Sequence, residues 1–189
     1  MTDLFSADHL KSKMIGVSLA LRLIRTDDAE YVYGLRVNPK YNQHLSKVSG
    51  TVQDQIAWIE NYKAREAEGL EYYYIIERLD GVRCGTVRLY DIASGAFTWG
   101  SWILDHNKTA KAALECAYII YKIAFDELKL SEANFEVSVD NQNTIMFHNR
   151  FGAIETNRDS ENLFFTYTRD RFEADREAFR NILEQAASQ

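Results

Sequence analysis

The sequence has little proline or cysteine and no long apolar run. Pro39 is the only proline among 189 residues, and Cys84 and Cys116 are the only cysteines. Because one cysteine falls in a predicted strand and the other in a predicted helix, we expect two small buried side chains in a reducing compartment, and no disulfide framework. No apolar run approaches the roughly 20 residues that cross a bilayer, and the N-terminus lacks the pattern of a secretory signal. These features predict a cytoplasmic protein without a membrane partner.

Positive charge is also scarce. The 22 Lys and Arg residues are outnumbered by 28 Asp and Glu residues, for a net charge of −6. This balance argues against non-specific binding of nucleic acid, but it allows a neutral or cationic small molecule. No histidine cluster has the spacing of metal ligands, and neither G-x-S-x-G nor a Walker-type loop is present, so we expect no metal.

The N-terminal third carries signals for one strand and two helices. Alternating leucines over 19–23 predict a strand. The Thr26 hydroxyl is expected to cap a helix that runs toward Val37 and stops before the proline. A second helix is predicted to start at its N-cap Thr51 and to end near Gly69.

The next segments alternate between strand and helix. Asp80-Gly81 joins two predicted strands, and a turn at Ser94-Gly95 leads to a third over 96–104. The apolar run 108–128 predicts a buried helix, which would connect this third strand to a parallel strand over 135–140.

Two more strands and a C-terminal helix complete a mixed α/β domain. We expect a single central sheet of six to seven strands with flanking helices. The predicted organisation is a peripheral segment over residues 1–15, the main domain over 16–170, and a helix over 171–189 packed on that domain.

The most informative stretch is NQNTIMFHNRFGA, in which an amide-rich turn leads from a strand into a short helix. It resembles the acyl-coenzyme A-binding end of the GNAT acetyltransferases, whose pattern reads roughly N-x-x-A-I-x-L-Y-x-K-x-G-F. Asn141, Ile145, Arg150 and Gly152 match the Asn, Ile, basic residue and Gly of that pattern. His148 falls where the family often has a tyrosine that protonates the departing thiolate. The resemblance covers most of residues 16–170 and implies the GNAT fold, acetyl-coenzyme A (acetyl-CoA) as cosubstrate and transfer of an acetyl group to an amine.

The resemblance also places the rest of the cofactor. The two parallel strands would splay, and backbone groups of Ile103 and Leu104 would pair with the pantetheine amides. Asn141, Asn143 and the neighbouring Phe147 would contact the rest of that arm.

A strand end that leads into a helix start suits a pyrophosphate, because backbone amides and the positive end of the helix dipole meet there. The family places the pyrophosphate at this point with Q/R-x-x-G-x-G/A. The aligned residues are Asn107, Lys108, Thr109, Ala110, Lys111 and Ala112, in which alanine replaces the usual glycine and the two lysines add positive charge.

The catalytic assignment is less complete. His148 is the candidate general acid, which requires an unperturbed or raised pKa or a relayed proton. The strand over 96–104 lacks the glutamate that many family members use as a base. Thr98 or Ser101 could hold a water, and Asp91 and Glu77 are more distant candidates.

Aromatic side chains on the hairpin strands suggest an acceptor pocket. We assign Tyr90, Trp99 and Trp102 to it, although the odd spacing of the two tryptophans puts them on opposite faces unless a bulge at Gly100 intervenes. We expect at most one of them, Trp99, to line the crevice. The sequence resembles the enzymes that acetylate nucleotide-linked amino-deoxysugars, as in the pseudaminic-acid route.

Two alternatives remain open. One is acetylation of a protein or peptide N-terminus, as in the ribosomal-protein acetyltransferases. The other is a non-catalytic module that binds coenzyme A (CoA). A homodimer is a possible assembly for any of these.

Overall fold

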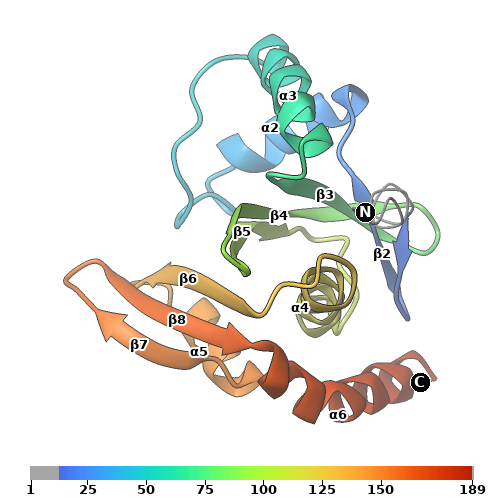
Figure 1. The fold of residues 1–189 in the computed structure, drawn as a ribbon. Coiled ribbons are helices and arrows are strands. Elements are labelled where there is room, and N and C mark those ends of the chain that lie inside the picture. Colours follow the sequence, from blue (N-terminus) through green and yellow to red (C-terminus); the bar gives the residue numbers. More distant parts are fainter. Residues whose placement is uncertain (1–12, 189) are drawn as a thin grey trace, which may run out of the picture.

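The computed structural model describes residues 13–188, which form a mixed eight-stranded sheet with helices on both faces (Figure 1). The strand order is β1-β2-β3-β4-β5-β6-β8-β7, and β5 and β6 form the parallel pair that the sequence predicted. The sheet is therefore somewhat wider than the six to seven strands expected. The strands are β1 (Met14–Ile15), β2 (Leu19–Leu23), β3 (Tyr72–Arg78), β4 (Arg83–Ala93), β5 (Ala96–Leu104), β6 (Glu132–Ser138), β7 (Ile154–Arg158) and β8 (Asn162–Thr168).

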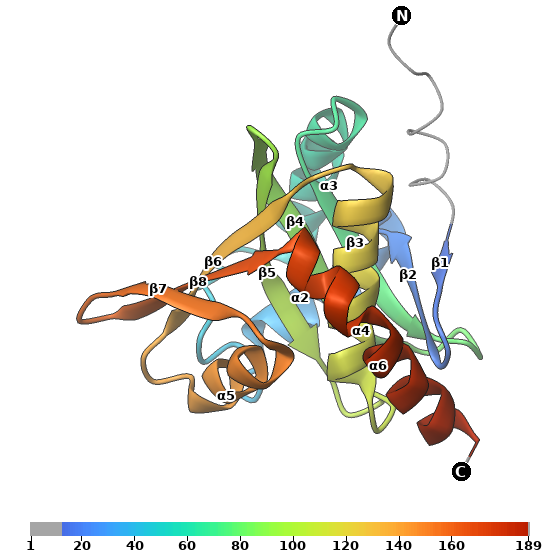
Figure 2. The ribbon, with the colours of Figure 1, turned by 60° about the horizontal axis from the view of Figure 1, so that its bottom comes forward.

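The helices form two layers. α2 (Ala29–Val37) and α3 (Val52–Ala67) cover one face of the sheet, and the other elements cover the opposite face (Figure 1). The opposite layer consists of α4 (Ala112–Lys122), the π-helical turn η2 (Ile123–Glu127), α5 (Gln142–Phe151) and α6 (Arg169–Ala187). β6, β8 and β7 extend beyond these layers as an arm (Figure 2).

β3 illustrates why the middle of the sheet is apolar on both faces. Tyr73 and Ile75 pack with α2 and α3, whereas Tyr74 and Ile76 belong to the larger core beneath α4. Side chains alternate between the two faces of a strand. The run YYYII is therefore buried at every position.

The helix starts correct one prediction and confirm another. Thr51 caps α3 as predicted, since its hydroxyl accepts from the Asp54 amide and the Asp54 carboxylate accepts from the Thr51 amide. The prediction for Thr26 was wrong, because a short 3-10 turn, η1 (Thr26–Asp28), precedes α2 and its cap makes no side-chain hydrogen bond. Asp28 instead accepts a hydrogen bond from the Arg25 amide at 2.9 Å.

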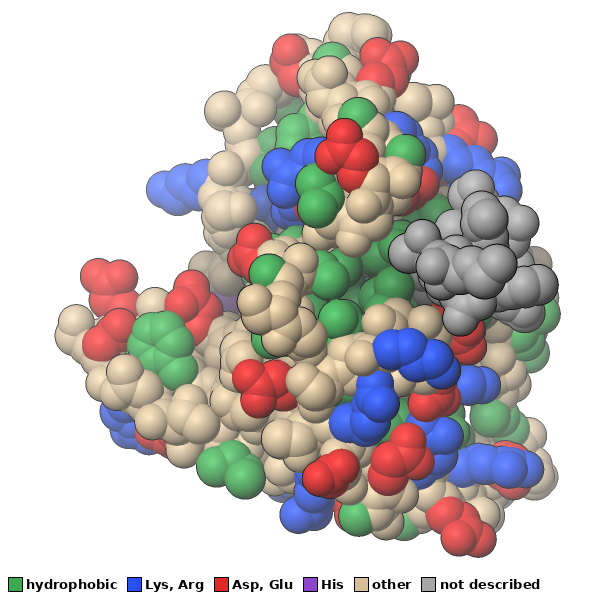
Figure 3. Space-filling view, in the orientation of Figure 1, with side chains coloured by type: hydrophobic (Ala, Val, Ile, Leu, Met, Phe, Trp, Pro, Cys, Tyr) green, Lys and Arg blue, Asp and Glu red, His purple; other side chains and the backbone are tan. Residues whose placement is uncertain are grey.

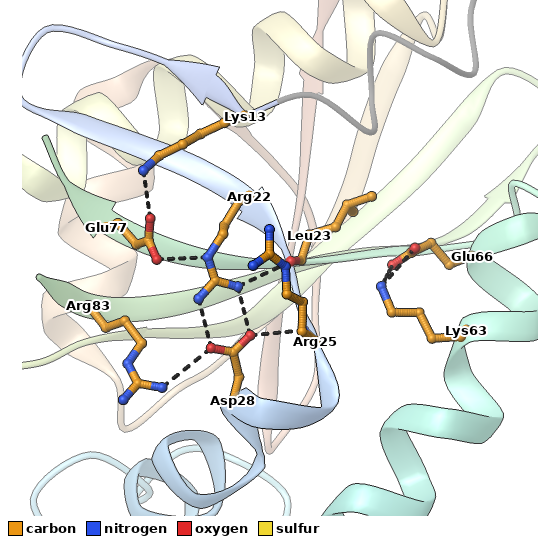
Figure 4. Close-up of polar contacts among 9 residues, drawn as sticks. All are labelled: Lys13, Arg22, Leu23, Arg25, Asp28, Lys63, Glu66, Glu77 and Arg83. Carbon is orange, nitrogen blue, oxygen red and sulfur yellow. Dashed lines mark hydrogen bonds and ion pairs between the residues drawn. The ribbon is translucent and has the colours of Figure 1, made fainter. Parts of the chain in front are cut away.

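Asp28 belongs to a buried ion-pair cluster that fixes the start of α2 to the sheet (Figure 4). Arg22 of β2 donates to both Asp28 oxygens at 2.7 Å and, through Nε, to Glu77 of β3 at 2.7 Å. Lys13 and Arg83 complete the cluster. The Arg22 hydrogen bond lowers the pKa of Asp28 despite the opposing effect of burial. These pairs position α2 relative to β2, β3 and β4.

Other boundaries differ from the predictions by a few residues. The helix expected over 108–128 starts only at Ala112, while α6 starts slightly earlier than predicted, at Arg169. Residues 1–12 of the segment expected to be peripheral lie outside the described residues, and Met14–Ile15 pairs with β2 as an edge strand.

The described residues also bear on cysteine, membranes and metals. Cys84 and Cys116 are buried and unpaired, as expected. No helix within residues 13–188 is long and apolar enough to cross a membrane. That part of the chain also has no group of three His, Cys, Asp or Glu side chains placed to hold a metal ion.

Candidate active site

The two parallel strands separate soon after they begin. β5 and β6 pair only at Ala96–Glu132 and Phe97–Ala133, whereas β6 pairs with β8 along its whole length. Beyond Phe97, no described strand pairs with the edge of β5 that faces β6. The strands thus splay toward their carboxyl ends. Ligands of open α/β sheets usually bind at this end of the strands.

A bulge in β5 lies beside this opening. Gly100 pairs with Arg88 and Ile103 pairs with Thr86, so Ser101 and Trp102 together oppose the single residue Val87. Ser101 has a positive φ of 47°. Such an extra residue reverses the facing of the side chains that follow it.

The bulge decides the positions of the two tryptophans. Trp99 and Trp102 lie on the same side of β5, with their ring centroids 5.1 Å apart. The odd spacing of the two tryptophans predicted opposite faces unless a bulge intervened near Gly100. That bulge is present, so the two rings lie on one face. Trp99 is only 5% exposed and donates to Tyr121 of α4, so most of its surface is core.

A gap of about 120 Å³ opens where the strands separate. Four of the residues assigned to catalysis, the cofactor or the acceptor line it, namely Trp99, Trp102, Asn141 and His148. Ser101, a candidate for holding a water, lies there as well. The remaining lining comes from the loop before α3, from β5 and β6, and from the start of α5: His44, Leu45, Gly100, Phe135, Glu136, Val137, Ser138 and Thr144.

His148 lies at the gap as predicted, but in an environment that opposes the role of acid. Its side chain is buried among aromatic rings, the nearest being Phe135 at 4.4 Å between centroids. Burial lowers the pKa of His148 to about 3, because an imidazolium is poorly solvated there. The ring is therefore neutral near pH 7, and we withdraw its assignment as the general acid. Its Nδ1 has no hydrogen-bond partner among the described residues.

The other α5 residues divide between the gap and the surface. Asn141 caps the helix by accepting from the Thr144 amide at 3.2 Å. Phe147 is half-buried and packs on Trp102, with ring centroids 5.1 Å apart. The side chains of Asn143 and Arg150 are exposed and do not line the gap. Gly152 ends the helix with a left-handed φ of 98°.

The predicted pyrophosphate loop is a turn that precedes α4. Asn107 to Lys111 connect β5 to the helix, with Lys108, Ala110 and Lys111 exposed. The buried carboxylate of Asp105 anchors the start of this turn by accepting from the Asn107 amide at 2.7 Å and from the Tyr31 hydroxyl at 2.8 Å.

A second buried carboxylate, which the sequence reading did not consider, lies in the first turn of α4. Glu115 accepts hydrogen bonds from the backbone amides of Val17, Ser18 and Leu19 and from the Ser18 hydroxyl. The Ser18 hydroxyl is in turn 3.0 Å from that of Thr109. The β1–β2 turn thus holds the loop before α4 in place, while Lys108 and Lys111 of that loop remain exposed.

Two hollows adjoin the gap on the face that carries α2 and α3. One hollow, of about 350 Å³, shares Ser101 with the gap and includes Arg36, Trp58 and Arg88. The other shares Glu136 with the gap and lies against the arm. Figure 3 shows the molecule notched between the arm and the α2–α3 layer, with acidic side chains on the arm below and Lys and Arg side chains above.

Tyr90 lines the hollow at the arm, together with Thr98, a candidate for holding a water, and Asp91, a candidate base. Burial raises the pKa of Tyr90, and the charge of Asp91 adds to the rise. Glu77 lies in none of these three linings and is paired with Lys13 and Arg22, so its candidacy as a base was wrong.

Sequence reasoning missed several residues of this region. His44, Glu136, Arg36, Trp58 and Arg88 come from separate elements and carry no shared motif. Only the alternation of β6 could have indicated Glu136, because its neighbours Phe135 and Val137 point into the core.

The comparisons with known proteins decide the family. The model of the acetyltransferase (GNAT) domain matches residues 18–154, which is most of the chain. The protein belongs to the GNAT acetyltransferase family. It is therefore an N-acetyltransferase, in a family that uses acetyl-CoA. No curated protein sequence matched the chain.

Among solved structures, the chain is similar to FdhC, described as a nucleotide-linked sugar GNAT. The match has a TM-score of 0.85 and 37% identity and covers 92% of this chain and 99% of FdhC. Spermidine N-acetyltransferase from Vibrio cholerae, solved with CoA and spermine, matches with a TM-score of 0.71 at 15% identity, over 84% of this chain and 99% of that one. Ribosomal-protein-S5-alanine acetyltransferase from Vibrio fischeri matches with a TM-score of 0.73 at 13% identity, over 84% and 97%. The last two show the fold alone.

Proposed function

We propose that this GNAT enzyme transfers the acetyl group of acetyl-CoA to the amino group of a nucleotide-linked amino-deoxysugar. The observation that carries the proposal is the gap between β5 and β6, which shares Ser101 with one hollow on the α2–α3 face and Glu136 with the other. The acetyl donor and the acceptor can therefore meet at Ser101 and Glu136 while approaching from different sides. The similarity to FdhC over nearly the whole of both chains supports the choice of acceptor.

The residues of the gap fit the pantetheine arm of acetyl-CoA. The edge of β5 beyond Phe97 pairs with no described strand, so Ile103 and Leu104 can pair with amides as one more strand would. Lys108 to Ala112 would hold the pyrophosphate through backbone amides and lysine charge. When bound, acetyl-CoA supplies an activated acetyl group and a thiolate leaving group.

The amine must lose a proton, and we assign this proton to Glu136. Its side chain is exposed on β6 and lines both the gap and the hollow at the arm. A carboxylate in reach of the amine can take the proton directly or through one water. Glu136 would thus replace the glutamate that β5 lacks.

The departing thiolate needs no side-chain acid. Thiols have pKa values of about 8.5, so the sulfur can leave as a thiolate and take its proton from water. The neutral His148 would then act as a hydrogen-bonding group in the wall of the gap.

The charges of the hollow beneath α2 and α3 favour an anionic acceptor over a polyamine. A polyamine needs an acidic pocket along its whole length, whereas two arginines and one aspartate are the charged residues lining the hollow beneath α2 and α3. A nucleotide sugar combines an amine with a diphosphate, and so matches an acidic group at Glu136 and basic groups beyond it.

The test is release of free CoA thiol from acetyl-CoA with a panel of amines. The panel contains dTDP- and UDP-linked amino-deoxysugars, spermidine and a peptide with an N-terminal alanine. We expect turnover with a nucleotide-linked amino sugar alone. The matched control is the same nucleotide sugar with a hydroxyl in place of the amine, which should give only background hydrolysis.

Other outcomes would favour the alternatives. Turnover with the peptide, and none with the sugars, would support an N-terminal acetyltransferase. Tight binding of acetyl-CoA with no turnover against any amine would support a non-catalytic module.

A further inference from the structure

The hollow beneath α2 and α3 is built from the segment 46–51, two helices and the strands β3 and β4. Its volume of about 350 Å³ is within the range of small-molecule sites, roughly 300–1,000 Å³. It reaches the gap at Ser101, so a ligand with its amine at the gap can extend into the hollow. The lining residues that bear on a ligand are Arg36, Asp54, Trp58, Arg88 and Ser101.

Arg36 presents hydrogen-bond donors that the protein does not fully use. Its Nη2 donates to the carbonyl and the hydroxyl of Ser46, at 2.9 and 2.8 Å. Its Nε is buried and has no partner among the described residues. Buried polar groups are nearly always hydrogen-bonded in native proteins, so a donor left in this state points to a missing acceptor.

Arg88 is held in a fixed orientation on the opposite wall. Its guanidinium lies over the rings of Trp58 and Tyr90, at 5.5 and 5.0 Å from their centroids. Its Nε donates to the buried carboxylate of Glu71 at 2.6 Å and its Nη2 donates to the same carboxylate, which leaves Nη1 for a ligand. Arg65 pairs with that carboxylate as well. Glu71 is thus shared by two arginines, which leaves the wall with excess positive charge.

The acidic residue of the hollow does not offset these arginines fully. The Asp54 carboxylate accepts from both the amide and the hydroxyl of Thr51, and these bonds lower the pKa of Asp54. It is therefore occupied by the helix cap. The hollow at the arm, by contrast, has Asp91 and Glu136 and no Lys or Arg in its lining.

We infer that Arg36 and Arg88 bind the diphosphate of the acceptor, with the nucleoside against Trp58. This inference rests on the proposed function and names the part of the enzyme that recognises the nucleotide. Arginine donors match phosphate oxygens in geometry and charge. The Trp58 residue is 40% exposed at the same wall. Its ring stacks on Tyr62 and lies beneath Arg88, so the nucleoside would pack against its exposed edge.

The first experiment measures binding of dTDP and UDP by calorimetry in the presence of saturating CoA. We expect both diphosphates to bind, and thymidine and uridine to bind far more weakly. CoA also contains a diphosphate, and saturating CoA fills the predicted pyrophosphate site at the loop before α4. Any dTDP or UDP that still binds must therefore occupy another site. Loss of dTDP and UDP binding on addition of CoA would place them at the loop before α4 and overturn the inference.

The variant Arg36→Gln should weaken diphosphate binding by about 10- to 100-fold, as expected for loss of a charged hydrogen bond. Arg36→Lys should retain part of the affinity, and Arg88→Lys, which keeps the charge beside Glu71, should show an intermediate loss. The matched control is Arg25→Gln, which removes the same charge from an exposed side chain near the start of α2. A CoA affinity equal to that of the wild type shows that each variant is folded.

The outcomes separate this inference from the proposed function. Equal diphosphate affinity in wild type and Arg36→Gln would overturn the inference, whatever the enzyme acetylates. Arg36-dependent binding of dTDP or UDP in an enzyme that acetylates no nucleotide sugar would leave the diphosphate site intact and overturn the proposed acceptor.

Discussion

The Nε1 of Trp99 donates a hydrogen bond to the Tyr121 hydroxyl at 3.1 Å, which ties the strand beside the gap to the buried helix α4. Trp99 also packs against Phe135 and His148, and its centroid lies 6.1 and 5.4 Å from theirs. One wall of the candidate active site is therefore also the centre of the core.

Replacing Trp99 should affect stability before it affects recognition of the acceptor. Trp99→Ala should lower the free energy of unfolding by about 3–5 kcal/mol, which is typical of a buried aromatic residue. Urea unfolding followed by circular dichroism measures this loss. A double-mutant cycle of Trp99→Phe with Tyr121→Phe would isolate the hydrogen bond. A Trp99→Ala protein of normal stability with a raised acceptor KM would contradict the core assignment.

The loop before α4 provides a test of the cofactor site. Ala110→Asp should abolish CoA binding, because it adds bulk and negative charge where the pyrophosphate is expected. Calorimetry with CoA measures the effect. Ala174→Asp, at an exposed position of α6, is the matched control. Unchanged affinity in Ala110→Asp would show that the pyrophosphate binds elsewhere.

Glu136 is the assigned proton acceptor. Glu136→Gln should lower kcat by about 10²–10⁴-fold, the usual contribution of general base catalysis. CoA affinity should change little, since the substitution keeps the size of the side chain. His44→Gln removes the other solvent-exposed titratable side chain of the gap and should leave kcat nearly unchanged. A loss of kcat in His44→Gln with none in Glu136→Gln would reassign the base.

His148 should make the protein less stable in acid. Its folded-state pKa of about 3 lies below the unfolded value of 6.5, so the unfolded chain binds more protons between these pH values. The free energy of unfolding should therefore fall as the pH drops from 6.5, by about 2–3 kcal/mol at pH 4.5 from this group.

Urea unfolding of His148→Phe between pH 4.5 and 7.5 checks this dependence. In His148→Phe, the free energy of unfolding should no longer fall by this amount as the pH is lowered. In the control His106→Gln, which changes an exposed histidine, the fall should remain. An unchanged slope in His148→Phe would mean that the imidazole becomes protonated without unfolding the protein.

Local sequence patterns predicted the elements and the family. The Thr51 N-cap, the Asp80-Gly81 hairpin and the strand over 96–104 depend on short-range chemistry, and the structure has all three. The position of the stretch from Asn141 to Gly152 beside the separated strands followed instead from the resemblance to the family. The N-cap of the first helix was misjudged because Asp28 turns back to Arg22 of β2 and to Arg83 of β4, and the contact with Arg83, 55 positions away, cannot be read from neighbouring residues.

Only the tertiary structure decided the chemistry of the site. A bulge at Ser101 put both tryptophans on one side of β5, and the aromatic surroundings of His148 kept its imidazole neutral. Arg36 and Arg88 are 52 positions apart in the sequence yet line the same hollow. Residue types and spacing determine which helices and strands form, whereas protonation states and side-chain facing depend on what those elements bury against one another.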